Sequence, residues 1–182
     1  MVLVTRYQEF VERLTDRIGK MFSFLIYPMM FVLLHEVVLR YAFNRPTIWA
    51  SELSALFYGV YFLIGGVYAL RRRAHINVEI FYARLSERGK AIVDLVTWNL
   101  FYFFAFVLFW QGVGFAWNSI ATLEVSNTIW GPPIWPVKIF VPFSAALLIL
   151  LGFSKTIDDV ITVITGHART REKSAEVGGE TL

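Results

Sequence analysis

The stretch RRRAHINVEIFYARLSERGK, residues 71–90, decides the fold, because it separates two long segments that carry no charge. The stretch itself carries six basic residues: Arg71, Arg72, Arg73, Arg84, Arg88 and Lys90. Leu53 to Leu70 precedes it and Leu95 to Trp117 follows it, and each is about as long as the ~20 apolar residues that cross a bilayer. A basic loop between two spans marks the cytoplasmic face of a membrane protein, which sets the direction of the other segments.

The composition is that of a membrane protein rather than of a soluble domain. The chain has 182 residues, of which 57% are hydrophobic and 17% charged, whereas soluble domains average about 45–50% apolar and about 25% charged. The absence of cysteine excludes disulfides and thiolate metal sites. The pI near 9.3 is explained by basic residues beside the spans, and we do not expect nucleic-acid binding.

The predicted fold is an all-α integral membrane protein with four transmembrane helices. We place the spans at about 21–39, 53–70, 92–117 and 134–153, in one domain covering residues 1–165. Amphipathic surface helices are expected in the central loop, over 76–85, and at the N-terminus, where a solvated leader is an equal alternative. The fourth helix is expected to run on past Lys155, and the polar tail 166–182 to be disordered in the cytoplasm.

The first span contains three residues that are unusual in a membrane. Pro28 is expected to kink the helix, since proline removes one backbone hydrogen bond. His35 and Glu36 lie near the far end, and ionisable groups in a span invite a functional interpretation. Both are also close enough to the end to reach the headgroup layer or to pair with Arg40, so their role is left open.

The connections on the far side are predicted to be short and rigid. Asn44-Arg45-Pro46 is typical of a turn. Thr47 is expected to cap the next helix, with Glu52 in its early turns. In the second connection, Lys138 is expected to extend from the fourth span back to the loop side.

The distribution of basic residues predicts the topology. All but three of the 17 Lys and Arg residues lie in segments assigned to one side, and the three exceptions are Arg40, Arg45 and Lys138. This asymmetry places both termini in the cytoplasm.

No pattern in the sequence indicates an enzyme or a cofactor site. The three histidines, His35, His75 and His167, lie in different regions, and no metal-binding pair, nucleophile elbow or phosphate loop occurs. No charge lies deep in a span, as a self-sufficient proton-coupled carrier needs. The residues alone therefore predict a small four-span protein that packs against something else.

Two segments carry a resemblance to a known family. Arg40-Tyr41-x-Phe43-Asn44-Arg45-Pro46-x-x-Trp49-x-x-Glu52-Leu53 and the Arg-x-x-His-Ile-x-Val-acid pattern at Arg72 to Glu79 resemble the small membrane subunit, DctQ type, of tripartite ATP-independent periplasmic (TRAP) transporters. Paired acids follow the tryptophan in many members, whereas Ser51 replaces the first here. The second pattern usually ends in Asp, whereas this chain has Glu79.

The resemblance implies a bacterial inner-membrane protein that works with a large DctM-type membrane subunit and a periplasmic DctP-type solute-binding protein. Substrates of such systems are organic acids such as C4-dicarboxylates or sialic acid, and the coupling Na⁺ is expected in the large subunit. The small subunit would brace the large one and help dock the binding protein, without enzymatic activity or a cofactor.

Candidate interface residues follow from this resemblance. Arg40, Trp49 and Glu52 are expected to form a periplasmic-side scaffold cluster. Arg71, Arg72, Arg73 and His75 are expected to contact lipid or the large subunit.

Two alternative functions remain open at this stage. One is a self-contained dimeric four-span exporter, for which Glu36 is the candidate membrane carboxylate. The other is a membrane-anchor subunit of a redox complex.

Overall fold

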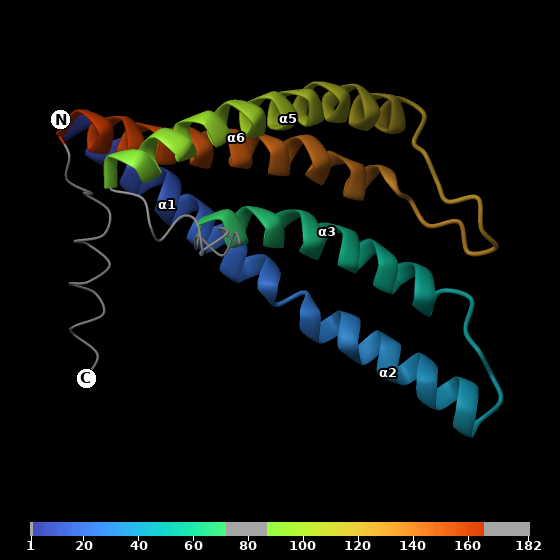
Figure 1. Cartoon of the computed structure of the whole chain (residues 1–182). Coiled ribbons are helices and arrows are strands. Elements are labelled where there is room, and N and C mark those ends of the chain that lie inside the picture. The colour runs from blue at the N-terminus through green and yellow to red at the C-terminus, as the bar shows by residue number, and fades with distance from the viewer. Residues whose placement is uncertain (1, 72–86, 166–182) are drawn as a thin grey trace, which may run out of the picture.

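The computed structural model describes residues 2–71 and 87–165, and their regular structure is helical apart from one β-bridge between Val125 and Pro133. Figure 1 shows the helices, which are α1 (Val2–Ser23), α2 (Ile26–Ala42), α3 (Ala50–Arg71), α5 (Glu87–Ala121) and α6 (Trp135–Thr165). Within the described residues, four stretches are long and apolar enough to cross a membrane: Arg6–Ala42, Ala50–Arg71, Val96–Ala121 and Trp135–Ile157. The predicted all-α fold with four membrane-crossing helices is confirmed.

The helices extend beyond the predicted spans. The fourth helix continues past Lys155 to Thr165, as expected, and α2 reaches Ala42 rather than ending at 39. The predicted surface helix over 76–85 and the polar tail 166–182 lie outside the described residues.

Pro28 determines where the first span is interrupted. The helix breaks at Phe24 and Leu25, and the amides of Leu25 and Tyr27 donate to carbonyls three residues back, at 3.1 and 3.2 Å. A proline has no N–H and its ring crowds the carbonyl four residues earlier, here that of Phe24. The predicted kink is therefore realised as a turn that separates α1 from α2.

The helices lie side by side in the order α2, α3, α6, α5, and do not form a closed bundle. The main packing partner of α2 is α3 and that of α5 is α6, while α1 contacts both α3 and α6. Figure 1 shows the α2–α3 and α5–α6 hairpins spreading apart toward the connections 43–49 and 122–134. We call this the loop end, and the opposite end, where α1 crosses α3 and α6, the base.

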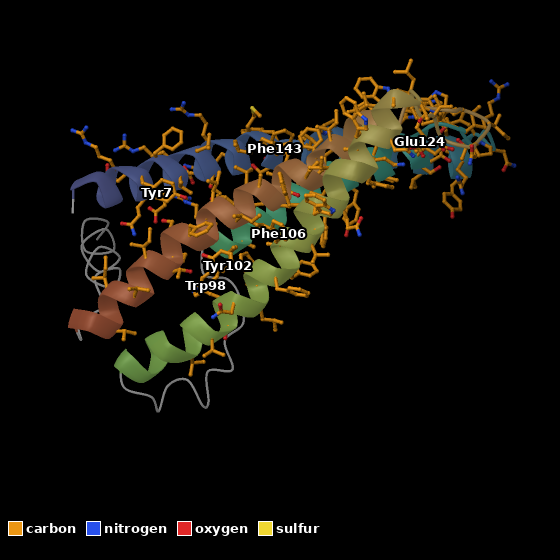
Figure 2. All side chains as sticks on the ribbon, turned by 90° about the horizontal axis from the view of Figure 1, so that it is seen from above. Tyr7, Trp98, Tyr102, Phe106, Glu124 and Phe143 are labelled. Atoms are coloured by element: carbon orange, nitrogen blue, oxygen red, sulfur yellow. The ribbon has the colours of Figure 1, made fainter. Side chains whose placement is uncertain are left out.

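Small residues bring α5 and α6 close together. A Cβ built on Gly112 would lie 3.1 Å from Val141 Cγ1 and 3.2 Å from the backbone nitrogen of Pro142. Figure 2 shows Trp98 and Tyr102 on the side of α5 that faces α6, where the Tyr102 ring lies 5.1 Å from that of Phe153. Because lipid is as apolar as these side chains, close van der Waals packing is what holds such helices together.

The predicted amphipathic helix at the N-terminus forms as α1. Its apolar side packs on α3 and α6, where Val11 forms a buried cluster with Leu70 and Leu151. Further along, Ile18 and Phe22 pack against a second cluster built from Ile64, Val67 and Leu147. The packed side thus belongs to the protein interior, and the place of α1 at a membrane surface stays a prediction.

The two glycines at positions 112 and 114 of α5 provide a test of the helix packing. We expect Gly112→Val to lower the free energy of unfolding by about 1–3 kcal/mol, since overpacking of a tight contact has that cost. Gly114→Val is the matched control, because within the described residues no packed atom lies within 4 Å of a Cβ there. Both variants introduce the same side chain into the same helix, so helix propensity cancels. Equal free energies of unfolding for the two variants in detergent would contradict the close α5–α6 contact.

Candidate functional site

Polar side chains gather at the two ends of the helices, and no group of three or more His, Cys, Asp or Glu residues suited to a metal ion occurs in the described ranges. Three clusters stand out: one between α2 and the 43–49 connection, one in the 122–134 connection, and one at the base. The first two join a connection to a neighbouring helix, and the third joins α1 to α3 and α6, which are distant in sequence.

The first cluster, the Glu36 cluster, consists of Glu36, Arg40 and Thr47. Glu36 is only 6% exposed. Its Oε1 accepts from Arg40 Nε at 3.0 Å and from Arg40 Nη2 at 2.5 Å, and its Oε2 accepts from the Thr47 amide at 3.0 Å and from the Thr47 hydroxyl. The two charge-assisted bonds from Thr47 therefore hold the second half of the 43–49 connection against α2, and the two from Arg40 hold the carboxylate in place within the helix.

The backbone next to the Glu36 cluster makes a tight turn after α2. Asn44 has φ of 54°, a left-handed conformation that asparagine tolerates better than most residues. The amide of Arg45 donates to the carbonyl of Leu39 at 3.0 Å, which closes the end of α2. The predicted turn at Asn44-Arg45-Pro46 is confirmed.

The predicted helix cap at Thr47 is wrong. The next helix, α3, begins at Ala50, and the Thr47 side chain donates to Glu36 instead. The buried carboxylate of Glu36 has two oxygens to satisfy and Thr47 offers two donors, so the side chain serves the acid on α2. From the sequence, only the pairing of Glu36 with Arg40 could be expected, because the two residues are four positions apart. The contact with Thr47 could not.

The three predicted scaffold residues Arg40, Trp49 and Glu52 lie at the loop end, but their contacts go to different partners. Arg40 binds Glu36, and the Trp49 ring lies 5.8 Å from the ring of His35 on α2. Glu52 Oε2 is buried and has no hydrogen-bond partner among the described residues. His35 and Glu36, whose role was open, are thus the residues of α2 that hold the start of α3 and its preceding connection.

The second cluster organises the 122–134 connection. The amide of Ser126 donates to the carbonyl of Pro132 at 2.8 Å, and the amide of Ile134 donates to the carbonyl of Glu124 at 3.1 Å. The connection therefore folds back on itself like a small hairpin. The carboxylate of Glu124 binds Lys138 Nζ at 2.5 Å, and the same ammonium lies 4.1 Å from the ring centre of Phe115. Lys138 therefore extends to the loop side, as predicted.

The charge of Lys138 sets the ionisation of Glu124. The hydrogen bond from Lys138 lowers the pKa of the Glu124 carboxyl below its ordinary value. The acid lies in the connection between Ala121 and Trp135, outside the spans. The ion pair ties this connection to the first turn of α6, and the contact of Lys138 with the Phe115 ring adds a link to α5.

The third cluster fastens α1 at the base. Asp16 binds Arg71 at the end of α3 and also Lys20 at 2.7 Å. Lys155 on α6, only 7% exposed, lies 3.7 Å from Glu12, and Gln8 donates to the carbonyl of Ser154 at 3.2 Å. These contacts join α1 to both neighbouring helices.

The base cluster contains one of the four residues that were predicted to contact lipid or the large subunit. The Arg71 side chain, 24% exposed, is engaged by Asp16, whereas Arg72, Arg73 and His75 lie outside the described residues. Sequence reasoning counted Lys155 only among the bases on the cytoplasmic side and missed its pairing with Glu12, because residues so far apart in sequence give no local pattern.

Large apolar side chains cover the outer side of α5. Five of them recur every three or four residues and are exposed, which places them on one face of the helix; they are Phe103, Phe106, Trp110, Val113 and Trp117. We call this set the α5 stripe. Together with the uncharged composition of Leu95 to Trp117, it presents a surface suited to lipid or to the helices of another protein.

Comparison with known proteins gives two findings. Residues 29–162 match the family described as "Tripartite ATP-independent periplasmic transporters, DctQ component". The chain is also similar to the sialic acid TRAP transporter small permease protein SiaQ of Vibrio cholerae, with 30% identity over 59 residues. That alignment covers 32% of this chain and 34% of the relative, so it spans about a third of the relative's length.

The Glu36 cluster can be tested with Glu36→Gln. An amide supplies one acceptor oxygen where the carboxylate supplies two, so the new NH₂ group must face a donor of either Arg40 or Thr47. We expect the amide hydrogen of Thr47 to exchange roughly ten-fold faster, because it loses a charge-assisted bond. Hydrogen-exchange mass spectrometry of the 43–50 segment measures this.

Arg45→Gln is the control for that experiment. The Arg45 side chain is exposed and makes no ion pair within the described part of the chain. Its removal should leave exchange in the segment unchanged. Equal exchange in the Glu36→Gln variant and the parent would show that the carboxylate does not hold the connection.

The Glu124–Lys138 pair predicts a defined response to acid. A carboxyl whose pKa is lowered by folding stabilises the fold above its unfolded pKa, about 4.3, and that contribution disappears as the pH falls through the folded pKa. We expect the difference in melting midpoint between the parent and Lys138→Met to be constant at neutral pH and to shrink below about pH 4.3. A difference that stays constant down to pH 3 would contradict a stabilising ion pair.

Proposed function

Because the chain belongs to the DctQ component family of tripartite ATP-independent periplasmic transporters, we propose that it braces a large transport subunit and helps dock a solute-binding protein. Membership makes it a small TRAP transporter subunit, and the finer roles are our proposal. The observation that supports them best is the exposed, uncharged outer side of α5 beside helices that are tied together at both ends.

A bracing role suits the arrangement of the charges. Glu36 accepts hydrogen bonds on both oxygens from Arg40 and Thr47, and Lys155 is paired with Glu12. Charged groups committed to such contacts stabilise the position of helices and are poorly placed to move an ion. We therefore assign the coupling Na⁺ and the substrate to the large subunit.

The α5 stripe is the surface that we propose for contact with the large subunit. Its aromatic side chains are spaced at helical intervals, and Phe106 and Trp110 stack with their ring centres 6.5 Å apart. Large aromatic groups already ordered on a rigid helix bury much area at low entropic cost, which favours association.

The loop end is the surface that we propose for the solute-binding protein. The tip of the 122–134 connection presents Ile129, which is 90% exposed, next to Trp130. The backbone hydrogen bonds of this connection and the Glu124–Lys138 pair hold the tip in place. An ordered apolar tip with a polar surround is typical of a docking site.

The proposed substrate class is organic acids. The similar Vibrio cholerae protein is named for a sialic acid transporter, and a sialic acid or a C4-dicarboxylate fits the systems that use such subunits. The chain itself gives no contact that selects between them, since we place the substrate in other subunits.

We further propose that the protein lies in the bacterial inner membrane with both termini in the cytoplasm and the loop end in the periplasm. A reporter that is active only in the cytoplasm, fused after Leu182, should therefore be active, and one fused within 122–134 should be inactive. An inactive reporter after Leu182 together with an active one within 122–134 would show that the orientation is the reverse of the proposed one.

The function can be tested by removing the chain and replacing it with variants. We expect its deletion to abolish uptake of the organic acid by whole cells, and the parent chain to co-purify with a large membrane subunit. Phe103→Ala combined with Trp110→Ala should reduce co-purification several-fold, because it removes two large contacts from the α5 stripe.

The matched control is Phe31→Ala combined with Leu34→Ala, which removes exposed apolar side chains from α2 at the opposite edge. It should co-purify like the parent. Full uptake in the deletion strain would refute the role of a required subunit. Solute transport by this chain alone in proteoliposomes would favour the exporter alternative, and haem absorption bands would favour the redox anchor.

A further inference from the structure

The charges of α1 are divided between its two sides. Glu12 and Asp16 face the other helices, where they pair with Lys155 and Arg71. These two acids are therefore neutralised within the protein, and they leave the outer side of the helix to basic residues.

The outer side carries a stripe that changes in character along the helix. Arg6, Phe10, Arg13 and Arg17 recur every three or four residues, which places them on one face, and all are exposed. Phe10 is 64% exposed and the Arg13 side chain 81%. The same face continues with Met21, and Phe24 follows in the turn after α1; both are exposed and apolar. We call this set the α1 stripe.

One acid lies beside the α1 stripe. Glu9 Oε2 is 3.5 Å from Arg13 Nη2, and both side chains are well exposed. An exposed pair at this distance is weak, because water screens it and two mobile side chains must be ordered. The α1 stripe therefore keeps an excess of positive charge.

The order of residues in the α1 stripe matches the layers of a membrane. Arg17 precedes Met21 by one helical turn, roughly 6 Å along the axis, and α2 continues the apolar stretch that is long enough to cross the hydrocarbon. The arginines would thus lie at the level of the headgroups and the apolar residues at the level of the acyl chains. Guanidinium groups bind phosphate through two parallel hydrogen bonds, which suits them to phospholipid headgroups.

From this charge pattern we propose that the α1 stripe is a binding surface for anionic phospholipid, of the phosphatidylglycerol class, with Arg6, Arg13 and Arg17 as the headgroup ligands. The family match begins at residue 29 and does not include α1. The proposal goes beyond the bracing function and requires only that α2 spans a membrane. Its role would be to fix the angle at which α1, and with it the base, meets the bilayer.

The absence of cysteine in the chain allows a direct test. A single Met21→Cys substitution in the full-length protein accepts a bimane label at the level where the stripe becomes apolar. The labelled protein is reconstituted in vesicles that contain either brominated phosphatidylglycerol or brominated phosphatidylcholine, and quenching of the label measures how often each lipid is its neighbour.

We expect phosphatidylglycerol to be preferred over phosphatidylcholine at least about five-fold, since each basic residue near an anionic surface favours contact by roughly that factor. Arg6→Gln, Arg13→Gln and Arg17→Gln together should reduce the preference to less than about two-fold. The melting midpoint of this triple variant in zwitterionic detergent should equal that of the parent, because the three side chains are exposed. Inorganic phosphate should not reduce the preference, because the binding surface requires a lipid held at the bilayer.

The matched control removes the same formal charge from the tail, with Arg169→Gln, Arg171→Gln and Lys173→Gln. It should keep the preference of the parent. Three results would overturn the proposal: no preference in the parent, an equal loss in the tail variant, or full competition by inorganic phosphate. The first points to a protein partner for the stripe, the second to net charge alone, and the third to a site for a soluble anion.

Discussion

Hydrocarbon offers no hydrogen-bond partner, and this constraint decides where charge can lie in the chain. An ionised side chain beside a span must find its partner within the protein or reach the headgroup layer. Glu36 and Lys155 are both almost fully buried, and each meets an opposite charge, Arg40 in one case and Glu12 in the other. The polar pairs therefore lie at the ends of the helices, while the middle is held by close apolar packing.

The two kinds of contact perform different tasks. Packing at Gly112 and around Phe153 keeps α5 and α6 together but is tolerant of sliding, since neighbouring turns of an apolar helix resemble one another. A charge pair forms only where its two particular side chains meet. The pairs at Glu36, Glu124 and Asp16 therefore define the register of the helices and the position of the connections, on which a docking role depends.

Local patterns in the sequence were sufficient for the four spans, the kink at Pro28 and the turn at Asn44, because each depends on neighbouring residues. They were insufficient for the side-by-side order of the helices. In α3 and α5 apolar residues occupy every side, since lipid and helix interfaces accept the same residue types, so periodicity does not show which side is packed. The contacts of Thr47, Lys155 and Arg71 join separate segments of the chain, so no regular local spacing reveals them.

The side-by-side order of the described helices has a geometric consequence. A ring of helices can surround a lumen, whereas a single file, with α2 and α5 at its margins, surrounds none. The described helices could then supply at most one side of an aqueous corridor for a solute, and its other walls would come from another polypeptide.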